Sequence, residues 1–193
     1  ECFFHPTNEN TIYAATQNGR LVRSNNGWLN FTNSLTSDID EFGEWTTPFL
    51  QHPLEDNTIF AGLQNIWKSQ NQGTSWIQLT DFLSGGGFSA PASCMAVSPT
   101  DPNTFYFGKR IYPAFNVIGE FWRTFDGGTT VDNITSGLPN HLYFTYCAIA
   151  PDDPMRVYVT VGGLEDGNKV FMSTNGGGDW ENISLNLPNI PVN

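Results

Sequence analysis

Carboxylates and aromatic rings gather in one segment of the chain, residues 37–45. It reads Ser37-Asp38-Ile39-Asp40-Glu41-Phe42-Gly43-Glu44-Trp45. Carboxylate oxygens accept hydrogen bonds from sugar hydroxyls, and an indole offers a large, rigid face for stacking. Two carboxylates about 5–10 Å apart can also hydrolyse a glycosidic bond. The segment therefore offers binding or acid–base catalysis through Asp38, Asp40, Glu41, Glu44 and Trp45.

Two further segments, residues 109–120 and 162–169, combine aromatic and charged side chains in the same way. We expect Tyr112 and Phe115 of the first segment, and Tyr143 outside both segments, to stack on sugar rings. Glu165 and Asp166 are candidate hydrogen-bond acceptors, and Arg110 completes the candidate ligand-binding set. Binding residues often lie on variable loops held by a rigid scaffold. The alternative is a set of solvated loops whose aromatic rings pack against neighbouring elements.

The histidines and cysteines do not form a metal-ligand pattern. His5 and His52 each directly precede a proline, and His141 stands alone. No histidine pair has the helical spacing of a metal site, and the cysteines lack a paired C-x-x-C arrangement. We therefore expect no metal, no cofactor and structural roles for the histidines.

The three cysteines, Cys2, Cys94 and Cys147, all lie shortly before a proline that ends an apolar segment. Cys2 and Cys147 precede theirs by four residues and Cys94 by five, which on a strand points to opposite faces. We expect small, buried residues on inner strands. An odd number of cysteines cannot be paired completely. The alternative to three free, buried cysteines is a disulfide between Cys94 and Cys147.

A repeated pattern of short apolar segments must position these candidates. Each copy carries an aromatic residue in its second segment, a hydroxyl residue at the end of its third and, in three copies, a tryptophan at the start of its fourth. A period of roughly 45–55 residues built from short strands is typical of propellers and other repeat arrays. We expect four repeats of four strands each, at residues 1–46, 47–92, 93–145 and 146–193.

The turn after each third segment also recurs. In the third copy it reads Thr124-Phe125-Asp126-Gly127-Gly128-Thr129-Thr130-Val131 and resembles the Asp-box, or BNR, repeat. A short Asp or Asn side chain satisfies backbone donors in such a turn, and Gly supplies a positive φ. In the first copy, Ser24-Asn25-Asn26-Gly27-Trp28, we expect a turn that lacks three residues. The turn residues are Ser24, Asn26, Ser69, Asn71, Gly73, Trp76, Thr124, Asp126, Gly128, Ser173, Asn175, Gly177 and Trp180.

Nearly the whole chain resembles bacterial secreted Asp-box proteins of the sortilin/Vps10-like and xyloglucanase-like types. The resemblance implies an all-β fold, a β-propeller of four-stranded blades, with the Asp-box turns at the periphery and structural in role. Residues 186–193 repeat the linker Gly137-Leu138-Pro139-Asn140-His141. We therefore expect these four repeats to be part of a larger propeller or parent chain. A closed four-bladed ring is the alternative.

Composition excludes several classes of partner. Lys and Arg total 8 against 19 Asp and Glu, so the formal net charge is −11. A nucleic-acid backbone and an anionic membrane surface both favour basic proteins, and no apolar run approaches the roughly 18 residues of a membrane span. We expect no nucleic-acid partner, no membrane insertion and an extracellular, cell-surface or periplasmic location.

Two functions remain open. The first is a non-catalytic module that binds a protein or glycan ligand through its loops, and the second is a fragment of a glycoside hydrolase that acts on a polysaccharide. Xyloglucanase-like proteins often carry an Arg-Thr-Asp-Val-Gly-Gly-type stretch, whereas the matching Ala15-Thr16-Gln17-Asn18-Gly19 lacks the carboxylate. We therefore favour the binding module. Photosystem assembly propellers also share the resemblance, but they carry a basic face that this acidic chain lacks.

Overall fold

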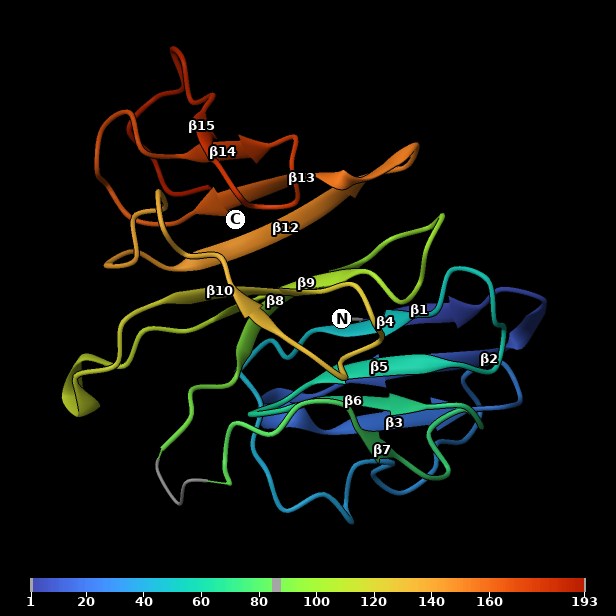
Figure 1. Ribbon diagram of the computed structural model, residues 1–193. Coiled ribbons are helices and arrows are strands. Elements are labelled where there is room, and N and C mark those ends of the chain that lie inside the picture. Colours follow the sequence, from blue (N-terminus) through green and yellow to red (C-terminus); the bar gives the residue numbers. More distant parts are fainter. Residues whose placement is uncertain (1, 85–87, 193) are drawn as a thin grey trace. The chain divides into compact units, whose positions relative to one another are not determined.

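The computed structural model describes residues 2–84 and 88–192, which form four antiparallel sheets (Figure 1). Two short 3-10 segments, Gln17–Gly19 (η1) and Pro113–Phe115 (η2), are the only helical elements of the described chain. In every sheet the strands lie side by side in chain order. The all-β, propeller-type prediction is confirmed, and the sheets are numbered below as blades 1–4.

The strands of blades 1 and 2 come from the first half of the chain. They are β1 (Cys2–His5), β2 (Asn8–Ala15), β3 (Leu21–Ser24), β4 (Phe49–Gln51), β5 (Ile59–Gly62), β6 (Ile66–Ser69) and β7 (Ile77–Gln78). Blades 3 and 4 follow. Their strands are β8 (Ala92–Val97), β9 (Phe105–Lys109), β10 (Glu120–Thr124), β11 (Asp132–Asn133), β12 (Phe144–Ala150), β13 (Asp153–Val161), β14 (Val170–Ser173) and β15 (Glu181–Asn182).

Blade 1 has three strands, so the prediction of four strands in every repeat is wrong there. Its turn has the same length as in the other copies, and Trp28, at φ +75°, occupies the position that Gly73, Gly128 and Gly177 hold elsewhere at φ +84°, +97° and +90°. The chain still returns along β3, because Thr32 N–H donates to the Arg23 carbonyl at 2.8 Å and Leu35 N–H to the Leu21 carbonyl at 2.7 Å. The expectation that this turn lacks three residues is therefore wrong, and the chain returns along β3 without forming a regular fourth strand.

The chain divides into two compact units, Glu1–Ala92 and Ser93–Asn193, which are described separately here. The first has a core that includes Tyr13, Phe49 and Ile59. The second has a core that includes Tyr106, Phe121 and Val159. Each unit holds one pair of consecutive blades, and each core is formed where those two blades pack together.

Strand alternation builds these cores. In β13, Val157, Val159 and Val161 are buried, whereas Tyr158 and Thr160 between them are half-buried. Side chains along a strand point alternately to its two faces, so β-branched residues at every second position give one apolar face. This face of blade 4 packs into the core of its unit.

One hydrogen-bonded turn recurs in all four blades. In blade 3, the Thr124 hydroxyl donates to Asp126 Oδ1 at 2.8 Å and accepts from the N–H of Gly128 at 3.0 Å. Asp126 Oδ1 in turn accepts from the N–H of Thr130 at 2.9 Å. The same three bonds are made from Ser24 and Asn26, from Ser69 and Asn71, and from Ser173 and Asn175. Each turn thus satisfies its own backbone donors.

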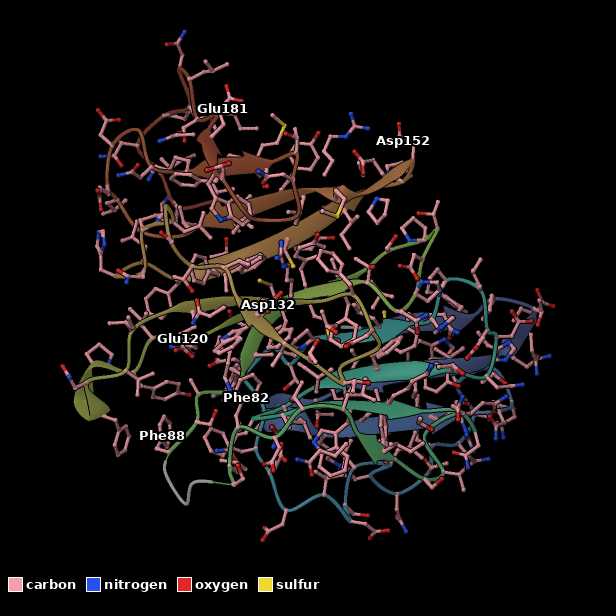
Figure 2. All side chains as sticks on the ribbon, viewed as in Figure 1. Phe82, Phe88, Glu120, Asp132, Asp152 and Glu181 are labelled. Atoms are coloured by element: carbon pink, nitrogen blue, oxygen red, sulfur yellow. The ribbon has the colours of Figure 1, made fainter. Side chains whose placement is uncertain are left out.

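In each unit, an arginine of the first blade donates a hydrogen bond to the turn of the second blade. Arg23 Nη1 donates to the Gln72 carbonyl, and Arg123 Nη1 donates to the Gly176 carbonyl at 2.6 Å. Arg123 also pairs with Asp132, whose carboxylate lies 3.2 Å away on the outer strand β11 (Figure 2). The repeated arginine position therefore joins neighbouring blades, which accounts for two of the basic residues of the chain.

Candidate functional site

An open depression of about 380 Å³ lies in the first unit, between the β2–β3 loop and the linker that leads to β4. It is lined by Ala15, Thr16, Gln17, Trp45 and Thr46. Trp45 is 67% exposed, which is unusual for so large an apolar side chain. The depression therefore combines an aromatic face with hydroxyl and amide groups. Of the predicted ligand-binding residues, it contains Trp45.

The loop and the linker are held together by their backbones. Asn18 N–H donates to the Glu44 carbonyl at 3.1 Å, and Gly43 N–H donates to the Asn18 carbonyl at 3.2 Å. Gly19 adopts φ +93°, and a Cβ there would lie 2.9 Å from Gly43 N. Only glycine fits this close approach without strain. The glycines thus bring Gln17 and Trp45 to the same depression.

Hydroxyl groups fix the linker on either side of Trp45. Thr47 Oγ1 donates to the Glu44 carbonyl at 2.7 Å, and Thr36 Oγ1 donates to the Gly19 carbonyl at 2.8 Å. Both threonines are buried. Buried bonds of this kind hold the backbone in one conformation, so the position of Trp45 is set by the scaffold.

Glu41 fastens the same linker to blade 2. Its Oε2 accepts from the backbone N–H of Asn65 at 2.8 Å and from Trp67 Nε1 at 3.1 Å, and its Oε1 accepts from Asn65 Nδ2 at 2.8 Å. Both carboxylate oxygens are therefore used inside the protein. This geometry gives Glu41 a structural role and not the ligand contact that we expected from the sequence.

The other acids of the linker differ in exposure. Glu44 is 8% exposed, whereas Asp38 and Asp40 are exposed. The Ser37 hydroxyl donates to Asp38 Oδ1 at 3.4 Å. Asp38 and Asp40 are therefore the exposed carboxylates of the linker, and neither lines the depression beside Trp45.

In the second unit, the structure brings together three of the predicted ligand-binding residues, Arg110, Tyr112 and Tyr143. The Arg110 guanidinium lies 5.6 Å from the centroid of the Tyr112 ring and 5.1 Å from that of Tyr143, both within cation–π range. Phe115 is 61% exposed, and its ring centroid lies 6.5 Å from that of Tyr112. These residues form a cationic aromatic cluster at the surface of this unit.

Glu165 is engaged by two neighbours. Its Oε2 lies 2.7 Å from His141 Nε2, and its Oε1 accepts from Asn168 Nδ2 at 2.6 Å. The hydrogen bond from His141 and that from Asn168 lower the pKa of the Glu165 carboxyl. Asp166 is exposed. No local sequence pattern singles out His141, because its partner Glu165 lies 24 residues further along the chain.

The two other histidines close turns. His52 Nδ1 accepts from the N–H of Leu54 at 3.1 Å and of Glu55 at 2.9 Å, and His5 Nδ1 accepts from Thr7 N–H at 3.3 Å. Burial lowers the pKa of His52. The Ser98 hydroxyl accepts from the corresponding turn in blade 3. These bonds give His5 and His52 structural roles.

The cysteines are all free. Cys94 and Cys147 are buried, as expected, but Cys2 is exposed, so the expectation of burial is wrong for Cys2. Cys2 begins β1 and pairs with Ala14.

Residues 2–84 and 88–192, which the structure describes, contain no group of three or more His, Cys, Asp or Glu side chains placed to hold a metal ion. None of their helices has the length and apolar character that crossing a bilayer requires.

The solved structures that are similar to this chain include β-propeller proteins. A GH74 xyloglucanase from Xanthomonas campestris superposes with a TM-score of 0.68 at 14% identity, over 92% of this chain and 29% of the enzyme. An ancestral GH74 enzyme gives 0.69 at 18% identity, over 94% and 27%. YCF48 bound to D1 peptide gives 0.56 at 13% identity, over 89% and 48%. No protein-family model and no curated protein matches the sequence.

These similarities show the β-propeller fold. The chain spans less than a third of the length of the two GH74 structures. Its four blades therefore correspond to a fragment of a larger propeller chain, as the repeated linker sequence predicted.

Proposed function

We propose that this chain is part of a larger, extracellular Asp-box propeller protein and binds a glycan in the depression beside Trp45. The single observation that carries the proposal is the combination of an exposed indole with Thr16, Gln17 and Thr46 around one depression of about 380 Å³. Ligand sites commonly have volumes of about 300–1,000 Å³ and place a few polar groups around apolar or aromatic surface.

The chemistry of the lining suits a sugar. A pyranose ring has apolar faces and a polar rim, so it can stack on the Trp45 indole while its hydroxyls exchange hydrogen bonds with Thr16 and Gln17. None of the side chains that line the depression is charged. A neutral, hydroxyl-rich ligand therefore fits better than a phosphate or a charged peptide side chain.

The comparisons support a polysaccharide as the source of that ligand. Solved GH74 structures include xyloglucanases, and nearly the whole of this chain superposes on part of one. The Thr16–Gln17 loop also matches the position of the Asp-containing stretch of xyloglucanase-like proteins. We therefore take a β-glucan of the xyloglucan type as the first ligand to test.

Binding is favoured over hydrolysis by the state of the carboxylates. Glycosidases need two carboxyl groups about 5–10 Å apart across the scissile bond. Gln17 stands in the loop where a carboxylate is expected, Glu41 is used internally, and Glu44 is buried. Asp38 and Asp40 are exposed but do not line the depression, so we assign them no catalytic role.

Calorimetric titration with xyloglucan oligosaccharides tests the proposal. We expect Trp45→Ala to weaken binding about fivefold or more, because stacking of this kind contributes on the order of 1 kcal/mol. Trp28→Ala is the matched control, since Trp28 is also exposed but does not line the depression. Equal affinities for wild type and Trp45→Ala, or no binding of any neutral glycan, would contradict the proposal. Release of reducing sugar would favour the hydrolase alternative.

A second candidate, protein binding, is favoured by the cluster of Arg110, Tyr112 and Tyr143. Arg and Tyr are enriched at the centres of protein interfaces, and here they are stacked together. Selection of displayed peptides on the wild-type protein, with counter-selection on Arg110→Ala, tests this candidate. Loss of the selected peptides on the variant is expected, and equal retention on both proteins would exclude it.

A further inference from the structure

Two thiols lie in the core between blades 3 and 4. Cys94 on β8 and Cys147 on β12 belong to the same hydrophobic cluster and are 4% and 3% exposed. Both are free. The fold has thus placed two of its three cysteines at one blade-to-blade contact.

The two sulfur atoms lie over the same short stretch of β9. Cys94 Sγ is 2.9 Å from the position that a Cβ on Gly108 would occupy, and Cys147 Sγ lies 3.9 Å from the Tyr106 carbonyl oxygen. Tyr106 and Gly108 are two residues apart on β9, so both contacts lie within one short stretch of that strand. Glycine at 108 leaves room for the Cys94 thiol beside this stretch.

We propose that Cys94 and Cys147 form a disulfide that joins β8 to β12 when the chain folds in an oxidising medium. The neighbouring strands hold both thiols in one hydrophobic cluster against residues 106–108 of β9. Cys2, which is exposed on β1, remains as the free thiol and accounts for the odd cysteine count.

The reaction needs an external disulfide, such as oxidised glutathione or the disulfide of a thiol oxidoreductase. The thiolate of one cysteine attacks that disulfide, forms a mixed disulfide and releases one small thiolate. The second cysteine then loses its proton, attacks the protein sulfur of the mixed disulfide and releases the other small thiolate. The protein loses two hydrogens and the oxidant becomes two thiols.

The timing follows from the burial of the thiols. Burial, together with the adjacent Cys94 thiol, raises the pKa of Cys147. The thiolate is the reactive form, so exchange is slow once the blades have closed. The bond therefore forms during folding and, once formed, is shielded from reductants in the native protein.

Peptide mapping after oxidative refolding is the test. The protein is refolded with reduced and oxidised glutathione, unfolded in denaturant and alkylated without reduction. We expect alkylation of Cys2 and one linked pair of peptides that contain Cys94 and Cys147, lighter by two hydrogens. Reduction before alkylation should restore two adducts. Complete alkylation of all three cysteines, or a link that includes Cys2, would overturn the proposal.

Two variants separate the bond from general effects on folding. Cys2→Ser should give the same linked peptides, because the exposed thiol takes no part. Cys94→Ala should leave Cys147 alkylated and abolish the decrease in midpoint denaturant concentration that reduction causes in the wild type. If Cys94→Ala does not fold, the map of the Cys2→Ser protein still decides the question.

Discussion

Trp180 Nε1 donates a hydrogen bond to the Ile134 carbonyl at 2.9 Å, so a side chain of blade 4 satisfies the backbone of blade 3. Trp76 Nε1 does the same for Leu35 in the first unit, at 2.8 Å. Gly177 reaches the Ile134 side chain so closely that a Cβ there would overlap it. The recurring turn is therefore a connection between blades as well as a local structure.

The first prediction concerns this bond. Trp180→Phe keeps an aromatic ring beside Phe121 but leaves the Ile134 carbonyl without its donor, so we expect a loss of about 1 kcal/mol in the free energy of unfolding. Trp180→Ala also removes the ring and should cost about 3 kcal/mol. Urea unfolding measures both. Trp28→Phe is the control, and a Trp180→Phe protein as stable as the wild type would refute the role of the indole.

The second prediction concerns the acid of the turn in blade 3. Hydrogen bonds from the Thr130 backbone and hydroxyl, and from Thr124, lower the pKa of Asp126. A lowered folded pKa gives stability that is present above the unfolded pKa, about 3.9, and is lost as the pH falls through the folded value.

Asp126→Asn should therefore leave stability near neutral pH almost unchanged and reduce the acid dependence. Asparagine makes the same bonds in the other three turns. Urea titrations from about pH 7 down to about pH 3 compare the two proteins. Asp40→Asn, outside the turns, is the control. An unchanged pH dependence in Asp126→Asn would count against the assignment.

The third prediction concerns His52. Its Nδ1 accepts two backbone hydrogen bonds, which requires that nitrogen to be unprotonated, and burial lowers its pKa. The stability it contributes is therefore complete above the unfolded pKa, about 6.5, and is lost as the pH falls through the lower folded value.

His52→Ser tests this dependence, because Ser98 accepts the corresponding bonds in blade 3. The free energy of unfolding of the variant should vary less with pH between about pH 7 and pH 5. His141→Ser replaces an exposed histidine and serves as control. If the two variants show the same pH dependence as the wild type, the titration belongs to another group.

The fourth prediction concerns Glu41. In Glu41→Gln, one carboxylate oxygen becomes an NH₂ group that must face a donor of Asn65 or Trp67. We expect a loss of about 1–3 kcal/mol in the free energy of unfolding, which calorimetry or urea unfolding measures. Asp38→Asn should cost nothing measurable. Equal stabilities of both variants would show that Glu41 is not a structural residue.

Much of the strand arrangement could be predicted from the sequence. β3, β6, β10 and β14 end at the expected hydroxyl residues Ser24, Ser69, Thr124 and Ser173. This succeeds because each turn is satisfied by residues within about four positions of one another, so local sequence contains the whole hydrogen-bond network. The expected loss of three residues in the first turn is wrong for the same reason, because Ser24, Asn26, Trp28 and Asn30 make these local bonds at the usual spacing, with Trp28 in the place of the turn glycine.

The site was less predictable, because its contacts are distant in sequence. Glu41 looked like an exposed acid of a variable linker, yet its partners lie 24 and 26 residues further along the chain. In the sequence, Thr16 and Gln17 stand out only because their loop lacks the carboxylate of the matching stretch in xyloglucanase-like proteins. Their approach to Trp45 depends on the packing of Gly19 against Gly43, which no local pattern indicates.

The most direct test of glycan binding follows the tryptophan indole signals in a ¹H–¹⁵N correlation spectrum during titration with a xyloglucan oligosaccharide. Trp45→Phe assigns one signal and Trp28→Phe another. The proposal predicts that the Trp45 signal shifts and saturates with the ligand while the Trp28 signal stays in place. A Trp45 signal that does not move at saturating ligand, or equal shifts at both tryptophans, would contradict the proposal.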